Sequence, residues 1–150
     1  MIRLSLTARL SLMFMLAVTG VLAAGMGTMQ GMFISETFYW DQDERTRAFT
    51  KRVQAKLPAG VFPNYVHAGN YSGVLHYLKA VKELGVGAAK NSGRAAVAAM
   101  KRMPTDDDAY GRGTVREDGR KIHPAHLYEV KRPGESRYTG DVYKLSATIP

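Results

Sequence analysis

The feature that most constrains the fold of this chain is a long stretch near its amino terminus without a charged residue. Arg3 and Arg9 are the only charged side chains before Glu36, and the run from Leu10 to Ala24 is strongly apolar. A basic start, an apolar run and then small residues form the layout of a secretory signal peptide, here with Val21-Leu22-Ala23 before a cleavage point. Such a segment does not join a globular core, so a folded domain is expected only after it.

The same stretch also fits an uncleaved anchor in the inner membrane. A spanning helix needs about 20 apolar residues at 1.5 Å per residue, and the run from Leu10 to Met26 lies at the short end of that range. Residues 1–24 are therefore expected to be a signal peptide or a membrane anchor with a hydrophobic helix. Residues 25–150 are expected to form the folded part.

The remaining sequence predicts alternating strands and helices. Asp41 offers a cap for one helix, with Glu44 three residues on, and Asn70 offers a cap for another, in which apolar residues recur at intervals of three and four. That apolar stripe consists of Tyr71, Val74, Leu75, Leu78 and Val81. In chain order we expect a strand in 30–40, a helix in 41–57, an extended piece in 61–68, helices in 70–84 and 93–103, paired strands around the Asp118-Gly119 turn, and strands in 125–131 and 143–149. This order is typical of an α/β fold.

Five stretches in the same order together resemble a known family. They are residues 30–53, 70–85, 100–104, 115–138 and 141–150. Together they resemble the C-terminal part of the periplasmic substrate-binding proteins of ABC transporters, of the branched-chain amino-acid type, over Gly25 to Pro150. Residues 1–24 look more like the membrane-entering start of a sensor histidine kinase.

The resemblance implies a partial type I periplasmic-binding-protein fold, with helices packed on a small, mostly parallel sheet. It implies a periplasmic, non-enzymatic protein that binds an amino acid or small amide when the missing lobe is supplied, and that docks on an ABC permease. The family's N-terminal portion, which holds both ends of the zwitterion, has no counterpart here, so tight binding by this chain alone is not expected. The alternatives are a membrane-anchored accessory protein or a non-functional remnant of such a receptor.

The candidate ligand-binding residues follow from the same resemblance. Phe38, Tyr39 and Trp40 would lie at a crossover between lobes, while His67 and Asn70 would lie just before and at the start of the next helix. The free N–H groups of a helix start can meet an anion. The competing interpretation is packing at the hinge for the three aromatic residues and a plain helix cap for Asn70.

Composition and spacing argue against other functions. The chain has no cysteine, which excludes disulfides and thiolate chemistry, and His123 and His126 would point to opposite faces of a strand, so no metal site and no cofactor are expected. Its net charge is +8, but the basic residues are spread over three predicted helices rather than one. We therefore expect no nucleic-acid partner, and no catalytic residues are predicted.

Overall fold

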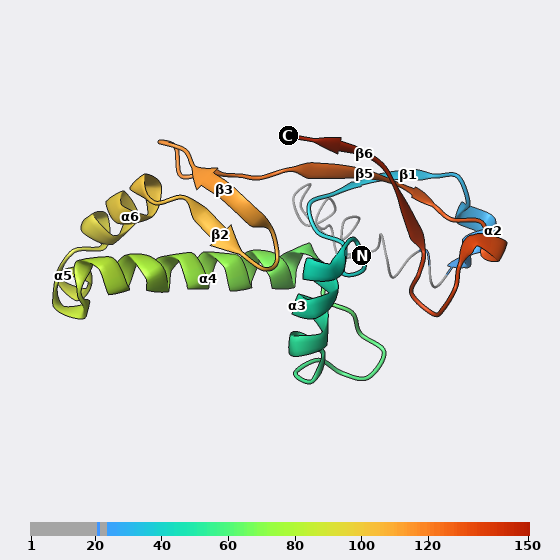
Figure 1. Ribbon diagram of the computed structural model, residues 1–150, viewed down its shortest axis with the longest axis horizontal. Helices are drawn as coiled ribbons and strands as arrows, with labels where there is room; N and C mark the ends of the chain where they lie inside the picture. Colours follow the sequence, from blue (N-terminus) through green and yellow to red (C-terminus); the bar gives the residue numbers. More distant parts are fainter. Residues whose placement is uncertain (1–20, 22–23) are drawn as a thin grey trace, which may run out of the picture. The chain divides into compact units, whose positions relative to one another are not determined.

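The computed structural model describes Val21 and residues 24–150, which fall into two compact units (Figure 1). Unit 1 contains the chain up to Ser35 together with His126–Thr148, and unit 2 contains Glu36–Ala125 with the last two residues. The predicted signal peptide or anchor lies outside the described residues, apart from Val21 and Ala24. Among the helices that the structure describes, none combines the length and the apolar character that crossing a bilayer requires.

Unit 1 is built on a three-stranded sheet. Its strands are β1 (Phe33–Glu36), β5 (Ala125–Val130) and β6 (Tyr143–Ile149), in the order β1-β5-β6, with the short helix α2 (Met26–Met29) and the 3-10 turn η1 (Pro133–Glu135) at the ends of strands. Alternate residues of β5 are buried, as a strand with one covered face requires. Lys131 N–H donates to the Val142 carbonyl and His126 lies beside Thr148, so β5 and β6 run antiparallel.

Unit 2 combines four helices with a second three-stranded sheet. The helices are α3 (Glu44–Gln54), α4 (Tyr65–Leu84), α5 (Val86–Asn91) and α6 (Gly93–Arg102), and the strands are β2 (Thr105–Asp107), β3 (Gly111–Val115) and β4 (Lys121–Ile122). Both β2–β3 and β3–β4 are antiparallel pairs. The predicted α/β class is confirmed, but the expected mostly parallel arrangement is wrong. The connections between these strands are tight turns, which are too short for the crossover that a parallel pair needs.

Two helices begin at caps other than the predicted ones. The Asp43 carboxylate, not Asp41, caps α3, accepting the Thr46 N–H at 2.8 Å while the Thr46 hydroxyl accepts the Asp43 N–H at 3.0 Å. Asn64, not Asn70, caps α4, and its side-chain oxygen accepts the N–H of Val66 at 3.0 Å. The second half of the predicted extended piece over 61–68 is therefore the first turn of α4, because a local pattern with two possible caps does not say which one the backbone uses.

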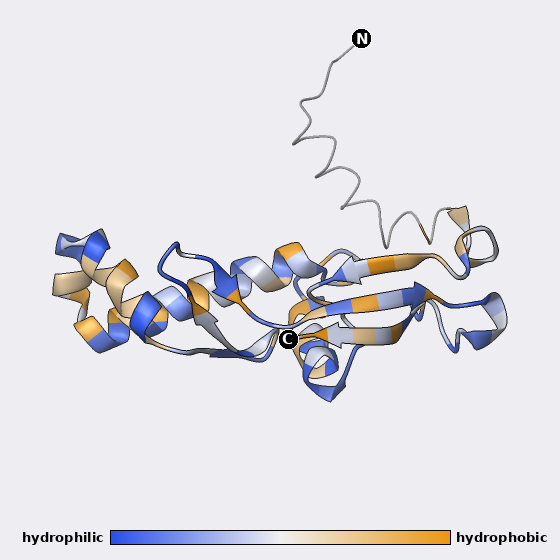
Figure 2. Cartoon of the chain, turned by 90° about the horizontal axis from the view of Figure 1, so that it is seen from above, coloured by the Kyte–Doolittle hydropathy of each residue, from blue (hydrophilic) through white to orange (hydrophobic). Residues whose placement is uncertain are grey.

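Helix α4 buries a different face from the one the sequence predicts. Its buried residues are Ala68, Ser72, His76 and Ala80, spaced by four, and they lie against the rest of unit 2. Of the predicted apolar stripe, Val74 and Leu78 are exposed, while Tyr71, Leu75 and Val81 are half-buried and only Tyr71 packs against the core cluster. Figure 2 shows α4 with apolar residues along its length. His76 is buried, and its Nε2 lies 2.8 Å from the Met100 carbonyl oxygen of α6.

Candidate functional site

The predicted crossover residues lie in an aromatic cluster of unit 2. Phe38 is only 3% exposed and meets Phe49 of α3 edge-on, with ring centroids 5.5 Å apart. It meets Tyr110 in the same way at 6.2 Å. Ala68 of α4 belongs to the same buried cluster. Edge-to-face pairs of this kind stabilise a core beyond simple burial, so Phe38 serves as a packing residue here.

Trp40 lies at the edge of this cluster and is half-buried. Its ring stacks on Phe62 with centroids 4.2 Å apart and an angle of 14° between the planes. Its carbonyl accepts a hydrogen bond from the Thr50 hydroxyl at 3.2 Å, which ties the backbone to α3. Tyr39 is buried beside Trp40, and the centroids of the two rings are 5.9 Å apart. Of the three predicted aromatic residues, Trp40 therefore has the part-exposed, stacked surface that an apolar ligand group could contact.

His67 and Asn70 lie within the first turns of α4 rather than before it. The His67 Nδ1 accepts the N–H of Asn64 at 3.3 Å and so completes the cap. The Asn70 amide donates to the Val66 carbonyl at 2.9 Å, a bond inside the helix. Both side chains are exposed. The helix starts at Asn64, whose side-chain oxygen accepts the N–H groups of Val66 and His67, so Asn70 does not lie at free helix-start N–H groups as expected.

A titratable carboxyl precedes the aromatic residues. Glu36, at the end of β1, is buried, and this burial raises its pKa from 4.5 to about 7 because a low-dielectric environment disfavours the charged form. Tyr110 lies close by, and its hydroxyl donates to the Tyr65 carbonyl of α4 at 3.1 Å. Burial first, and then the charges of Asp107 and Glu36, raise the pKa of Tyr110 against an opposing hydrogen bond with Thr37. Glu36 can therefore change its charge near neutral pH.

A second polar cluster was not predicted. Three consecutive aspartates, Asp106 to Asp108, are typical of a solvated loop, but the Asp107 side chain is only 3% exposed. Its carboxylate accepts the Ser72 hydroxyl of α4 at 2.5 Å and Lys121 Nζ of β4 at 2.9 Å, and also the N–H of Tyr110 at 2.7 Å. Burial alone would raise the pKa of Asp107, yet these hydrogen bonds hold it below its ordinary value. The partners lie 35 and 14 residues away, so no local pattern could have revealed them.

The neighbours of this cluster complete a network of rings and charges. Lys121 Nζ also lies 4.7 Å from the centroid of the Tyr110 ring, a cation–π contact, and His123 stacks on the other part of that ring at 4.3 Å. Asp108 forms an ion pair with Arg52 of α3. Every charge in this network has a partner of opposite sign or a ring face. The network therefore holds α4 and the sheet of unit 2 together.

Neither cluster has the composition of a metal centre. Across residues 24–150 no three histidine, aspartate or glutamate side chains are close enough to hold a metal ion. His126, in unit 1, lies 3.1 Å from the Thr148 hydroxyl, while His123 is engaged with Tyr110. The arrangement offers an apolar wall and polar helix-start groups, which suit contact with a small amphipathic molecule.

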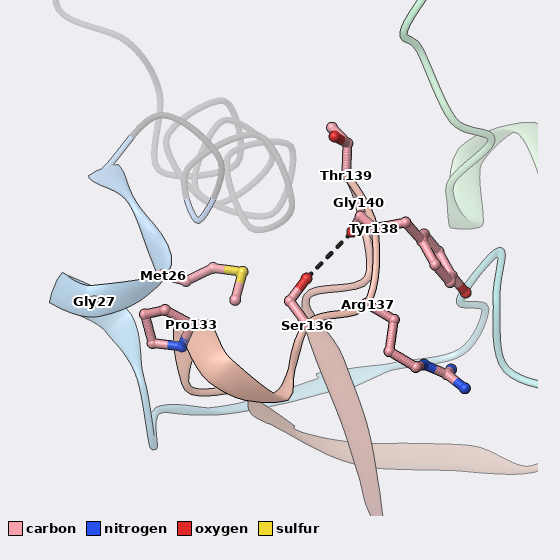
Figure 3. Close-up of a pocket in the computed structure, with 8 residues that line it drawn as sticks. All are labelled: Met26, Gly27, Pro133, Ser136, Arg137, Tyr138, Thr139 and Gly140. Atoms are coloured by element: carbon pink, nitrogen blue, oxygen red, sulfur yellow. Dashed lines mark hydrogen bonds between the residues drawn. The ribbon is translucent and has the colours of Figure 1, made fainter.

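A shallow hollow lies among the described residues of unit 1 (Figure 3). It measures about 510 Å³ and is lined by α2, Pro133 and residues 136–140. The Ser136 hydroxyl donates to the Tyr138 carbonyl across its floor at 3.2 Å. None of the predicted site residues lines it, and the Arg137 guanidinium beside it is already bound to Asp141 at 3.3 Å. The hollow therefore adds nothing to the predicted site.

A match to a known protein family covers most of this chain. The model of a family described as periplasmic binding protein matches residues 6–136, so the chain belongs to that family. Its members bind solutes for transporters and are not enzymes. No curated protein matches the chain.

Solved structures give the same family. A periplasmic binding protein from Burkholderia mallei is 37% identical, with a TM-score of 0.78 over 89% of this chain. A branched-chain amino-acid ABC transporter periplasmic ligand-binding protein from Burkholderia xenovorans is 38% identical, with a TM-score of 0.76 over 88% of it. A leucine-, isoleucine-, valine-, threonine- and alanine-binding protein from Brucella ovis, 20% identical with a TM-score of 0.69 over 86% of this chain and 33% of its own, shares the fold. The chain spans about a third of the length of these proteins, 34% for the two from Burkholderia.

Proposed function

We propose that this chain supplies part of the solute receptor of an ABC transporter for branched-chain amino acids or related small amides. The observation that carries the proposal is the 38% identity to the Burkholderia xenovorans ligand-binding protein over 88% of this chain. The receptor would work in the periplasm and deliver its solute to an ABC permease of the inner membrane. The α/β architecture agrees with a binding role.

Within this receptor, the aromatic edge of unit 2 would contact the apolar side chain of the solute. Trp40 and Phe62 present stacked rings, and the capped start of α4 next to them presents His67 and Asn70 to solvent. Phe38 and Tyr39 would act from behind by holding this edge in place, since both are buried. The polar ends of the solute would be held by the other part of the receptor.

The chain alone is expected to bind such a solute weakly or not at all. An amino acid carries two charges, and leaving either one unpaired in a dry site costs several kcal/mol. Because the chain spans about a third of its relatives' length, most of a receptor of that size lies outside it. The binding unit would therefore be complete only with that other part.

Calorimetry on a chimaera tests the proposal. Residues 25–150 would replace the corresponding third of the Burkholderia xenovorans protein, and the product would be titrated with leucine, isoleucine, valine and small amides. We expect binding, and an affinity at least ten times weaker for Trp40→Ala. Tyr138→Ala, a change of an exposed ring in unit 1, is the matched control and should leave the affinity unchanged. A folded chimaera that binds none of these solutes would contradict the proposal and favour a non-functional remnant.

For residues 1–24 we propose a signal peptide that exports the folded part. Its support is the basic, apolar and small-residue order of the sequence. Intact-mass measurement of the protein from cells should then give a start near Ala24. A start at Met1 in the membrane fraction would instead favour the alternative function, a membrane-anchored accessory protein.

A further inference from the structure

Three methionines share one short segment of unit 1. Met26, Met29 and Met32 follow one another at a constant spacing of three, although the whole chain has only 8 methionines. They are not core residues of the unit: α2 has no buried residue, and Met32 is 53% exposed. Burial in the interior of unit 1 therefore does not account for the three thioether groups.

The backbone keeps the three methionines close together. Met26 and Met29 lie at the two ends of α2, where residues three apart are neighbours on the helix surface. The Met32 N–H donates to the Met29 carbonyl at 3.1 Å, so a second turn of the same spacing follows directly. The Gly31 N–H donates to the Val130 carbonyl at 2.9 Å, and the Val130 N–H donates to the Met32 carbonyl at 2.8 Å. These two bonds tie the second turn to β5 and fix its position.

Thioether sulfur selects a particular class of metal ion. It is a soft, uncharged ligand that favours copper(I), whereas carboxylates favour Mg²⁺ and Ca²⁺, and imidazole suits zinc. No charged residue occurs between Ala24 and Ser35, so the segment offers sulfur without a carboxylate beside it in the sequence. A methionine side chain has three rotatable bonds, which lets sulfurs from two successive turns approach a common point. The segment therefore has the donors for a soft monovalent cation and lacks those for a hard divalent one.

The first of these methionines lies at the hollow of unit 1. Figure 3 shows the Met26 side chain extending from α2 into this hollow, which Pro133 and Ser136 also line. The positive charge nearest in the lining is that of Arg137, and its guanidinium is paired with the Asp141 carboxylate at 3.3 Å. A metal ion can thus reach the Met26 sulfur from solvent without any change in the fold.

We propose that Met26, Met29 and Met32 bind one soft monovalent metal ion of the copper(I) class through their three sulfur atoms. The ion keeps its oxidation state, and binding requires no proton transfer because thioethers carry no ionisable proton. The three methionines belong to unit 1, whereas the candidate solute residues belong to unit 2. The inference goes beyond the proposed function and does not depend on it.

Methyl NMR tests the site directly. The full chain, labelled with ¹³C in its methionine methyl groups, is titrated with Ag⁺, which has the charge and closed d shell of Cu⁺ and is not oxidised by air. We expect the resonances of Met26, Met29 and Met32 to shift along one common binding curve, since they share one ion. Those of Met100 and Met103 in unit 2 should stay in place. Equal shifts of Met100 and Met103, or no shift of the three, would overturn the inference.

Conservative variants separate coordination from packing. Met29→Leu removes the middle sulfur at nearly constant volume, so the fold is kept and the affinity for Ag⁺ should fall at least tenfold. Met103→Leu, the matched control at the end of α6, should bind like the parent. Unchanged affinity in Met29→Leu would contradict a shared ion. Zn²⁺ should leave the three resonances unmoved, and a shift of all three with Zn²⁺ would refute the assignment to a soft ion.

Discussion

Each unit contains a buried aspartate that pairs with a lysine, but the two aspartates hold different parts of the structure together. In unit 2 the buried Asp107 accepts backbone N–H groups of its own turn and pairs with Lys121, and in unit 1 the buried Asp141 accepts the Arg137 N–H at 3.0 Å and pairs with Lys131. Burial by itself would raise the pKa of both carboxyls. Their hydrogen bonds outweigh burial, so the pKa of each aspartate lies below its ordinary value. Only Asp107 also binds a helix, through Ser72.

This difference shows that one buried carboxylate can fix a loop or join two layers. The partners of Asp141 all lie within ten residues of it, so it organises only the β5–β6 connection. Asp107 reaches α4 and β4 at once, so it helps to fix the orientation of α4. Glu36 is the third case, a buried carboxyl whose pKa is raised rather than lowered.

Loss of Asp107, the carboxylate that joins α4 to the sheet of unit 2, should lower the free energy of unfolding most. Asp107→Ala removes the acceptor of the Ser72 hydroxyl and the counter-charge of Lys121 in a buried site, a kind of change that costs about 4 kcal/mol. We expect this loss in the free energy of unfolding measured in urea at pH 7. Asp106→Ala, at an exposed neighbour, should change it by less than about 0.5 kcal/mol. Equal losses would mean that the Asp107 network does not join the layers.

The carboxyl with the raised pKa should make stability depend on pH in the opposite direction to the two aspartates. Glu36 in the folded protein holds its proton up to about pH 7, while the unfolded chain releases it near 4.5. Its contribution is therefore present below pH 4.5 and is lost as the pH rises through 7, a loss of about 3 kcal/mol. Glu36→Gln should be more stable than the parent by about that amount at pH 8 and equal to it at pH 4. Parallel stability curves for the two proteins would show that Glu36 is not buried in solution.

Loss of Asp141, whose partners all lie near it in the sequence, should lower the stability less than loss of Asp107. Asp141→Ala frees the Arg137 guanidinium, which is 73% exposed and can return to water, but it leaves the Lys131 ammonium, 13% exposed, without its carboxylate, so about 3 kcal/mol is expected. Hydrogen exchange should increase in residues 131–142 and stay unchanged in α4. Faster exchange throughout α4 would erase the distinction between the two aspartates.

The smallest effect separates the two candidate caps of α4. Asn64→Ala removes the side-chain acceptor at the helix start and should cost about 1 kcal/mol, measured by thermal unfolding. Asn70→Ala, the matched control, removes only a bond inside the first turns and should cost less than about 0.5 kcal/mol. The reverse order would place the helix start at Asn70 after all.

The local sequence predicted which helices and strands form better than it predicted the residues at which they begin and end. Gly85 ends α4 with a φ of 83°, and Gly119, with a φ of 87°, lies in the turn between β3 and β4 as the Asp118-Gly119 pair indicates. A backbone turn of this hand favours glycine, so the sequence marks it directly. The cap of α4 was missed because Asn64 and Asn70 are chemically equal, and only the path of the chain before the helix distinguishes them.

The candidate site was predicted in part. The sequence pointed to the aromatic run and to the start of α4, and the structure places Trp40 against Phe62, two residues before the cap. It did not indicate Asp107, whose partners come from distant segments, or the burial of Glu36. The role of the site residues in binding stays a prediction until the chimaera is measured.

The sequence by itself determined that this is an α/β chain of the periplasmic binding protein family, because periodicity, turn residues and colinear segments are all local or additive signals. Only the tertiary structure decided which side of α4 faces inward. Periodicity finds the apolar stripe, but small residues permit closer packing than Val74 and Leu78, and Ser72 and His76 have hydrogen-bond partners only on the inner side. Interior packing is set by fit and by satisfied polar groups, and neither can be computed from hydrophobicity along one helix.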